Sequence, residues 1–304
     1  MGKIEVTFLG TAAGIPTKKR AHPAIHLAYT LDKEVCYLFD CGEGTQRQML
    51  FAGLNFMKIK KIFITHWHGD HYLGLPGLVE TMGFEGRKEP LTIYTPELER
   101  TKTLLSIGYF SPGFEILYRN VPVEGSKIEK LVETDYFEIL SISVEHTVPA
   151  VCYALVEKDR VRIDKEKLKS LGLPEKDKIY RILKEEKEIV FKGKKIKLED
   201  VSFVEKGKKI VYSGDTRICE NLKKISQNAD LLIQDCTYFD LNDFEQDYGH
   251  ASVEEVMDFI EKVNVKKVIL THISRRYKNL KDLKEKIKKY PNLEIAKDFM
   301  RIIL

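Results

Sequence analysis

Residues 65–71 of the chain read Thr-His-Trp-His-Gly-Asp-His, and this stretch decides how the rest of the sequence is interpreted. Three histidines and one aspartate fall within it, directly after the run KKIFI at 60–64, which predicts a β-strand. Imidazole nitrogens and carboxylate oxygens are the ligands that a borderline-soft divalent ion such as zinc prefers. A lone histidine usually belongs to a core, but this density of ligand-type side chains at a strand end indicates a metal site.

Three residues of the same chemical types follow strand-like runs much farther along the chain. His146 precedes Thr147, Asp215 lies in Ser-Gly-Asp-Thr at 213–216, and His272 ends VILTH at 268–272. Strand ends gather at one edge of a sheet, so these residues can meet the first group. The sequence therefore predicts a two-metal site. We expect one ion on His66, His68 and His146, a second on Asp70, His71 and His272, and Asp215 as the bridge between them.

Two cations about 3.5–4 Å apart would activate a water molecule and stabilise both oxygens of an in-line displacement at phosphorus. A water bound to such an ion has its pKa lowered to about 7, which gives hydroxide at neutral pH. Strand-like runs alternate with helical stretches along both halves of the chain, so the predicted fold class is mixed α/β. We expect apolar strands covered by helices.

Composition restricts the class of protein. The 304 residues are 43% hydrophobic and 32% charged, which excludes a disordered chain and a disulfide-stapled mini-protein. No apolar run approaches the roughly 20 residues that cross a bilayer. The five cysteines show no C-x-x-C spacing and indicate reduced thiols. We therefore expect a cytoplasmic protein that does not bind membranes.

Residues 158–200 differ from the rest of the chain. They hold 15 basic and 10 acidic residues, an excess larger than the net charge of +4 of the whole chain, so the remainder is slightly acidic. Their apolar residues look too scattered to form a core element. One interpretation is a solvated, charge-rich insertion, and the other is a basic arm that contacts a polyanion.

The pattern H-x-H-x-D-H with a distant His, Asp and His resembles the metallo-β-lactamase superfamily. That resemblance implies a four-layer αβ/βα sandwich with the metals at the sheet edges. Further stretches resemble the short form of the ribonuclease Z family of tRNA 3′-processing endoribonucleases: FLGTAAGIPTKKR at 8–20, FDCGEGTQRQM at 39–49, YSGDT at 212–216 and THISRRY at 271–277. The resemblance spans nearly the full chain. It implies a single domain over 1–304, with 158–200 inserted as a flexible tRNA-binding arm.

The resemblance also implies roles for individual residues. Asp70 is similar to the family's proposed proton acceptor, although it can instead serve as a ligand alone. His250 lies in Tyr-Gly-His-Ala-Ser at 248–252, ahead of a predicted helix, and resembles the general acid. Without the resemblance, His250 would be interpreted as an ordinary loop histidine. Asp40 resembles the superfamily's structural aspartate, which supports the metal loop through hydrogen bonds.

Basic residues near the motifs are candidates for substrate binding. Pro16, Lys18 and Arg20 match the family's P-x-K-x-R loop, which implies contact with the acceptor end of tRNA, and Lys19 completes the basic cluster. The alternative is a solvated loop. Arg276 closely follows His272 and is expected to neutralise a scissile phosphate.

These observations favour a zinc-dependent endoribonuclease that removes the 3′ trailer from precursor tRNA and leaves a 3′-hydroxyl. The expected cofactors are two Zn²⁺ ions per subunit. The expected partners are precursor tRNA and a second subunit of a homodimer, with no DNA. Two alternatives remain: a small-molecule phosphodiesterase or thioester hydrolase of the same fold, and a non-catalytic RNA-binding scaffold. The scaffold predicts eroded metal ligands, yet all seven positions hold competent residues.

Overall fold

The computed structural model describes residues 2–107, 111–173, 177–191, 193–240 and 248–304. The chain divides into two compact units, which are described separately. The larger unit contains Gly2–Val156 and Lys208–Leu304, and the smaller unit contains Glu157–Gly207. No helix among these described residues is both long and apolar enough to span a membrane.

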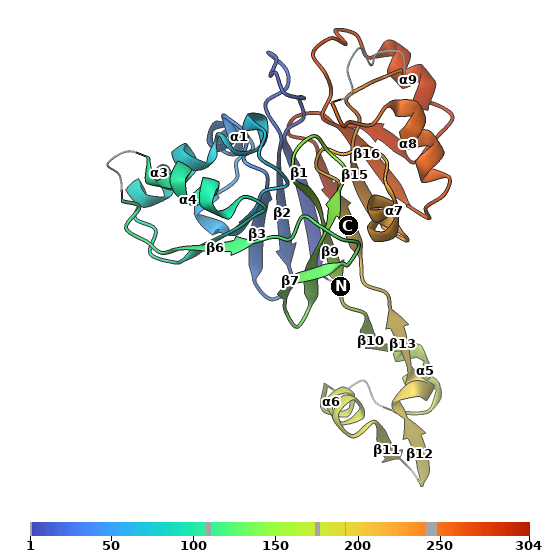
Figure 1. The fold of residues 1–304 in the computed structure, drawn as a ribbon. Coiled ribbons are helices and arrows are strands. Elements are labelled where there is room, and N and C mark those ends of the chain that lie inside the picture. Colours follow the sequence, from blue (N-terminus) through green and yellow to red (C-terminus); the bar gives the residue numbers. More distant parts are fainter. Residues whose placement is uncertain (1, 108–110, 174–176, 192, 241–247) are drawn as a thin grey trace. The chain divides into compact units, whose positions relative to one another are not determined.

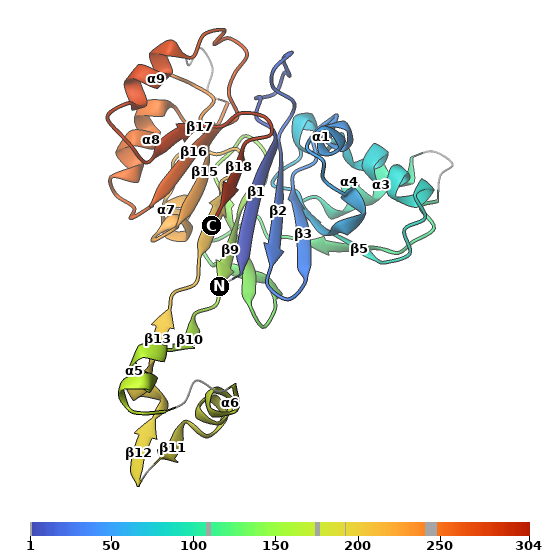
Figure 2. The same cartoon turned by 180° about the vertical axis from the view of Figure 1, so that it is seen from behind.

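The first sheet of the larger unit has seven strands. The four strands at one side of it, from β18 to β3, pair antiparallel with their neighbours. Figure 2 shows the C-terminal strand β18 beside β1. Its strands, in spatial order, are β18 (Arg301–Ile303), β1 (Lys3–Gly10), β2 (Ala24–Thr30), β3 (Glu34–Phe39), β4 (Ile59–Phe63), β5 (Leu91–Thr95) and β6 (Ile116–Asn120). The hairpin predicted from AIHLAYT and VCYLFD is confirmed as the antiparallel pair β2–β3.

The second sheet also has seven strands. Their order is β17 (Leu293–Ile295), β16 (Lys267–Thr271), β15 (Leu231–Asp235), β14 (Lys209–Tyr212), β9 (Ala150–Glu157), β8 (Phe137–Val144) and β7 (Glu129–Glu133). Strands β14 to β17 pair in parallel. Parallel strands are usually buried on both faces, which explains the nearly continuous apolar runs in this part of the sequence.

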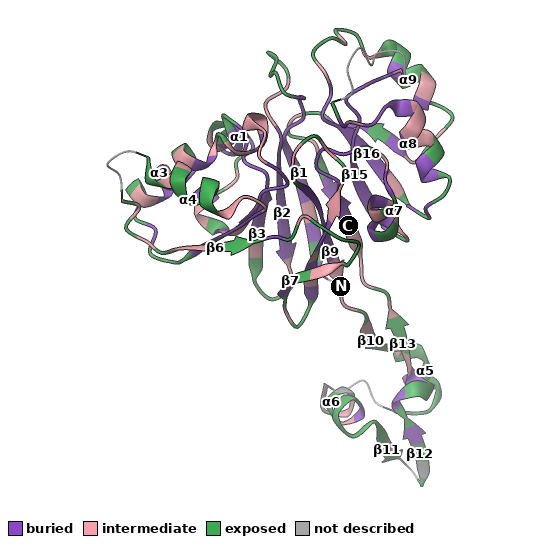
Figure 3. Cartoon of the chain, viewed as in Figure 1, coloured by how far each residue is buried: buried purple, intermediate pink, exposed green. Residues whose placement is uncertain are grey.

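Helices cover the outer faces of both sheets (Figure 1). On the first sheet these are α1 (Thr45–Phe51), α2 (Gly69–Tyr72), α3 (Leu75–Phe84) and α4 (Leu98–Ser106), and on the second α7 (Glu220–Ser226), α8 (Val253–Ile260) and α9 (Lys281–Ile287). One buried cluster joins the inner faces of the two sheets, and two others lie between a sheet and its helices. The central strands of both sheets are accordingly among the most buried elements of the larger unit (Figure 3). The architecture is helix, sheet, sheet, helix, as the sequence predicts.

The smaller unit has its own core, so the interpretation of its apolar residues as too scattered was wrong. It contains two antiparallel strand pairs, of which β11–β12 is a hairpin, with helices and a 3₁₀ turn. The elements are β10 (Arg160–Ile163) with β13 (Ser202–Glu205), β11 (Glu188–Phe191) with β12 (Lys194–Lys197), α5 (Lys165–Ser170), α6 (Asp177–Glu186) and η2 (Leu198–Val201). Leu168, Leu183 and Ile196 are buried together although they lie far apart in sequence. The unit also extends beyond the predicted 158–200, to Gly207.

Candidate metal centre

The motif at 65–71 begins just after β4 and contains the single turn of α2. His66 and His71 are fully buried, at 0% exposure. The amide of His71 donates to the carbonyl of His68 at 2.9 Å, which closes the helical turn. Because of this tight turn, His66 and His68 belong to one cluster of potential metal ligands, and Asp70 and His71 belong to a second cluster.

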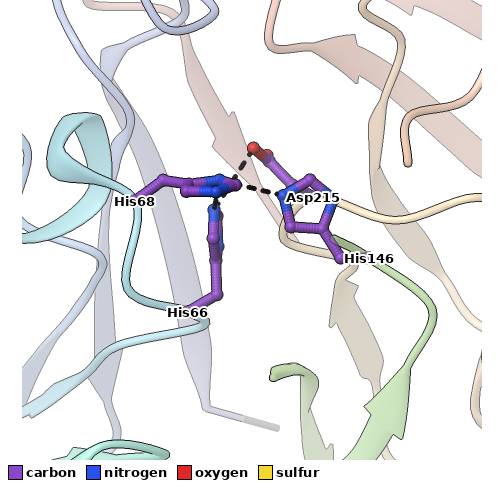
Figure 4. A group of neighbouring side chains, drawn as sticks. All are labelled: His66, His68, His146 and Asp215. Atoms are coloured by element: carbon purple, nitrogen blue, oxygen red, sulfur yellow. Dashed lines mark hydrogen bonds and ion pairs between the residues drawn. The ribbon is translucent and has the colours of Figure 1, made fainter. Parts of the chain in front are cut away.

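His66, His68, His146 and Asp215 form the first group of potential metal ligands (Figure 4). Nδ1 of His68 lies 3.1 Å from Nε2 of His66 and 3.0 Å from Nε2 of His146. His146 follows β8, and its Nδ1 donates to the carbonyl of Gly249 at 2.9 Å, which leaves Nε2 to face the group. Burial lowers the pKa of all three histidines, so they are neutral, the form that binds metal.

Asp70, His71, Asp215 and His272 form the second group. Oδ2 of Asp215 lies 3.2 Å from Nε2 of His71 and 3.1 Å from Nε2 of His272, and it is also 3.5 Å from Nε2 of His66 in the first group. One carboxylate oxygen is thus shared by both groups. The structure places all seven predicted ligands in these two groups, divided as the sequence analysis divided them.

The donor set fits divalent cations. Nε2 of His71 is buried and forms no well-directed hydrogen bond among the described residues, although Oδ2 of Asp215 is 3.2 Å away and Oδ2 of Asp70 is 3.4 Å away. Burial alone would lower the pKa of His71, but Asp215, Asp70 and Asp40 raise it well above its ordinary value. The pocket therefore concentrates negative charge around a buried imidazole nitrogen, as a cation site does.

Asp40, which follows β3, supports His71 of the second group and is also fully buried. Its Oδ1 accepts from the amide of Thr65 at 2.8 Å, and its Oδ2 accepts from Nδ1 of His71 at 2.8 Å and from the hydroxyl of Tyr212 at 2.7 Å. The hydrogen bond to Nδ1 fixes the His71 ring so that Nε2 faces the second group. This is the supporting arrangement that the sequence analysis expected of Asp40. Tyr212, which the sequence analysis missed, comes from β14 of the other sheet.

His250 lies at the rim of the second group, in the loop before α8. A capping box formed by Ser252 and Glu255 begins this helix. Nδ1 of His250 is 2.8 Å from Oδ2 of Asp235, the last residue of β15. Burial opposes a charge on His250, but Asp235 raises its pKa to about 9.

Asp235 also supports a metal-ligand candidate, and the sequence analysis missed it. Its Oδ1 accepts from the hydroxyl of Thr237 at 2.8 Å, and that hydroxyl lies 2.7 Å from Nδ1 of His272. The available signal was the run LLIQD at 231–235, a strand that ends in an acid as IFITH ends in a histidine. Asp235 and His250 with Asp215 and His272 also form a third group of possible ligands.

A cavity of about 830 Å³ opens over the groups, and we call it the central cavity. It is lined by His68, His250, His272 and Arg276, among others. The guanidinium of Arg276 lies 5.3 Å from the ring centre of Tyr238. The predicted phosphate-binding position of Arg276 is therefore at this cavity.

The loop at 16–20 contains two kinds of side chain. Pro16, Lys18 and Lys19 are exposed. Arg20 is only partly exposed, and its Nη1 donates to the Thr11 hydroxyl at 2.6 Å and to the carbonyl of Ala296 at 2.8 Å. The structure thus gives Arg20 partners within the chain, which fix the base of the loop, and does not present it to solvent with the lysines.

Two relatives align with this chain over most of its length. The ribonuclease Z of Pyrococcus abyssi is 44% identical over 306 residues, which cover 99% of this chain and 96% of that protein. The ribonuclease Z of Thermococcus kodakarensis is 45% identical over 278 residues, covering 90% of this chain and 85% of that protein. The chain belongs to the ribonuclease Z family. The resemblance found in the sequence is confirmed, and membership makes this chain a phosphodiester-hydrolysing enzyme.

Two family models and a solved structure of a ribonuclease also match this chain. Residues 4–164 belong to the family described as anti-Pycsar protein Apyc1, and residues 197–273 match the β-lactamase superfamily domain. The crystal structure of human tRNase Z, short form, superposes with a TM-score of 0.70 at 26% identity, over 98% of each chain. The metallo-β-lactamase fold is confirmed, and this fold implies a divalent metal, for which the two groups are competent.

Proposed function

We propose that this chain removes the 3′ trailer from precursor tRNA by endonucleolytic hydrolysis that leaves a 3′-hydroxyl on the tRNA. One observation carries the proposal: two ligand groups share Asp215 and lie beside a histidine that is hydrogen-bonded to a buried carboxylate. The relatives named ribonuclease Z support RNA as the substrate, and the similarity to human tRNase Z supports tRNA in particular.

The chain would hold two zinc ions. His66, His68 and His146 would bind one, Asp70, His71 and His272 the other, and Asp215 both. When bound, such ions polarise a phosphoryl oxygen and make a coordinated water more acidic. His71 is oriented for this task by Asp40, and His146 by the carbonyl of Gly249.

His250 is the proposed donor of a proton to the leaving 3′ oxygen. Its Nδ1 is engaged by Asp235, so the proton offered to the substrate is the one on Nε2. Asp235 stabilises the charged ring and holds its orientation. Asp70 is the proposed proton acceptor for the attacking water, in addition to its role as a ligand, because its Oδ2 lies at the second group, 3.3 Å from His272.

Substrate contacts come from the exposed cations. Lys18 and Lys19, with Pro16 shaping their loop, would contact the acceptor end, Arg20 would fix the base of that loop, and Arg276 would meet the scissile phosphate. The smaller unit, which includes the predicted arm 158–200, would grip tRNA by its shape and phosphates. We further propose a cytoplasmic homodimer in which this arm serves the partner subunit, a state that light scattering measures directly.

The direct test is incubation of the zinc-loaded protein with a 3′-extended tRNA transcript, followed by mapping of both product ends. We expect a tRNA with a 3′-hydroxyl and a trailer with a 5′-phosphate. Asp70→Ala should abolish cleavage while tRNA binding in a filter assay survives. Products with the phosphate on the tRNA, or cleavage by Asp70→Ala at the wild-type rate, would refute this mechanism.

Removal of the arm separates tRNA processing from hydrolysis of small molecules. Val156 and Lys209 pair directly in the second sheet, so a short turn can replace 158–206 without moving β9 or β14. We expect this variant to lose precursor tRNA cleavage and to retain turnover of a chromogenic phosphodiester. Full retention of tRNA cleavage would remove the arm from substrate binding. The alternative, a small-molecule phosphodiesterase, would be favoured if the full-length protein turned over the chromogenic phosphodiester but cut no precursor tRNA.

A further inference from the structure

A second cavity of about 830 Å³ lies beside the central cavity of the larger unit, and we call it the basic groove. Three stretches line it, at 17–20, at 273–280 with Lys284, and at 297–299. Ser274, Arg275 and Lys278 line both cavities. The basic groove is therefore continuous with the space over the ligand groups.

The lining of the basic groove is strongly cationic. Its exposed basic side chains, none of which forms an ion pair with another described residue, are Lys18, Lys19, Arg275, Lys278, Lys284 and Lys297. The acidic residue in the lining, Asp298, faces inward, because its oxygens accept from the Thr11 hydroxyl at 2.6 Å and from the Ala21 amide at 2.7 Å. Uncompensated cations along a groove favour a polyanion.

An exposed aromatic ring also lines the basic groove. Phe299 is 42% exposed, and its ring centre lies 6.4 Å from that of Phe51, which is 62% exposed. A basic groove combined with an exposed aromatic side chain is the usual arrangement for single-stranded nucleic acid, in which cations follow the phosphates and bases stack on rings. The observations therefore favour a single strand over the wide backbone of a helical stem.

We propose that the basic groove binds the single-stranded 3′ trailer of the substrate, with Lys284 and Lys297 on its phosphates and a base stacked on Phe299. This inference rests on the proposed function. His250 would protonate the 3′ oxygen of the upstream nucleotide, and it lines the central cavity but not the basic groove. The proposal therefore places the strand downstream of the scissile phosphate in the basic groove. It would contact Lys284, Lys297 and Phe299, which lie on other stretches of the lining than the 17–20 loop assigned to the acceptor end. Trailer length then contributes to substrate affinity.

The test compares precursor tRNAs that carry trailers of one and eight nucleotides. The variants are Lys284→Ala/Lys297→Ala and Phe299→Ala, and the matched control is Lys33→Ala/Lys88→Ala, which removes two exposed lysines outside the groove. For the double groove variant we expect KM to rise about tenfold with the long trailer and less than about twofold with the short one. The control should match wild type with both substrates.

A second readout separates this inference from the proposed function. Binding of fluorescein-labelled oligo(U) of eight nucleotides is measured by anisotropy as salt is varied, and loss of two phosphate contacts should reduce the log–log salt slope by about 1.4. Equal KM changes for both trailers, or an unchanged salt slope in the double groove variant, would overturn the proposal that the basic groove binds the trailer. Failure of the wild-type enzyme to cut any precursor tRNA would instead overturn the proposed function, and the oligo(U) measurement would still decide whether the groove binds RNA.

Discussion

Asp40, directly after β3 of the first sheet, and Asp235, the last residue of β15 in the second sheet, occupy equivalent positions at strand ends. Each is fully buried, each lies at the end of a strand, and each accepts a hydrogen bond from a histidine Nδ1 at 2.8 Å. They differ in the histidine that each holds directly. Asp40 holds a ligand candidate, His71, whereas Asp235 holds His250, which belongs to neither predicted metal site, and reaches His272 only through the hydroxyl of Thr237. Under the proposed function, Asp40 would mainly maintain the metal site and Asp235 would mainly set the proton donor.

Asp40→Asn should have the largest effect. Asparagine offers one acceptor oxygen where the carboxylate accepts from Thr65, His71 and Tyr212, so a buried donor loses its partner at a cost of about 3–5 kcal/mol. We expect a lower free energy of unfolding, zinc content well below wild type and no measurable cleavage. Mass spectrometry of the metal and urea unfolding check this. The exposed control Asp32→Asn should change none of these quantities.

Asp235→Asn should break only the second half of the comparison. We expect kcat to fall about 100-fold because the proton donor is misoriented when Oδ2 is replaced. KM and zinc content should stay near wild type, because asparagine keeps the Oδ1 that accepts from Thr237. His250→Ala should behave alike, and the double variant should be no slower than His250→Ala alone, since the two residues act as a unit. Loss of zinc from Asp235→Asn, or additive effects, would contradict this division of roles. Asp258→Asn, at an exposed position of α8, is the matched control.

Another buried histidine, His26, sharpens the comparison, because no carboxylate of the described residues forms an ion pair with it. His26 in β2 is 3% exposed, and burial lowers its pKa to about 4. Because the unfolded chain binds this proton more tightly, the stability is fully present above pH 6.5 and declines as pH falls toward 4, by up to about 3 kcal/mol. His26→Gln does not titrate, so its unfolding free energy should fall less between pH 7.5 and 4.5. An identical decline in both proteins would contradict this, and cleavage at pH 7.5 should be unaffected.

The site residues differ in how far the sequence could predict them. Four of the potential ligands lie within six residues, so the sequence shows them as one pattern: His66, His68, Asp70 and His71. Asp235 supports the site only because β15 lies between β14 and β16, with Asp235 opposite Thr271. That order is a property of the sheet and is not written in any local spacing. Tyr212 of the second sheet likewise donates a hydrogen bond to Asp40 of the first. Arg20 donates to the carbonyl of Ala296, which lies far away in the chain.

The smaller unit shows a further limit. Its charge distinguishes it clearly in the sequence, but its core does not, because Leu168, Leu183 and Ile196 become neighbours only when two helices pack on a hairpin. Charge patterning thus located the insertion, whereas its internal order and its extension to Gly207 required the fold.

The central claim is that two cations are held by side chains from both sheets and share Asp215. The most direct measurement is an anomalous difference map at the zinc edge from crystals of the zinc-loaded protein. The account predicts two peaks, one among His66, His68 and His146 and the other among Asp70, His71 and His272, with the Asp215 carboxylate contacting both. A single peak, or two peaks with Asp215 bound to neither, would contradict it.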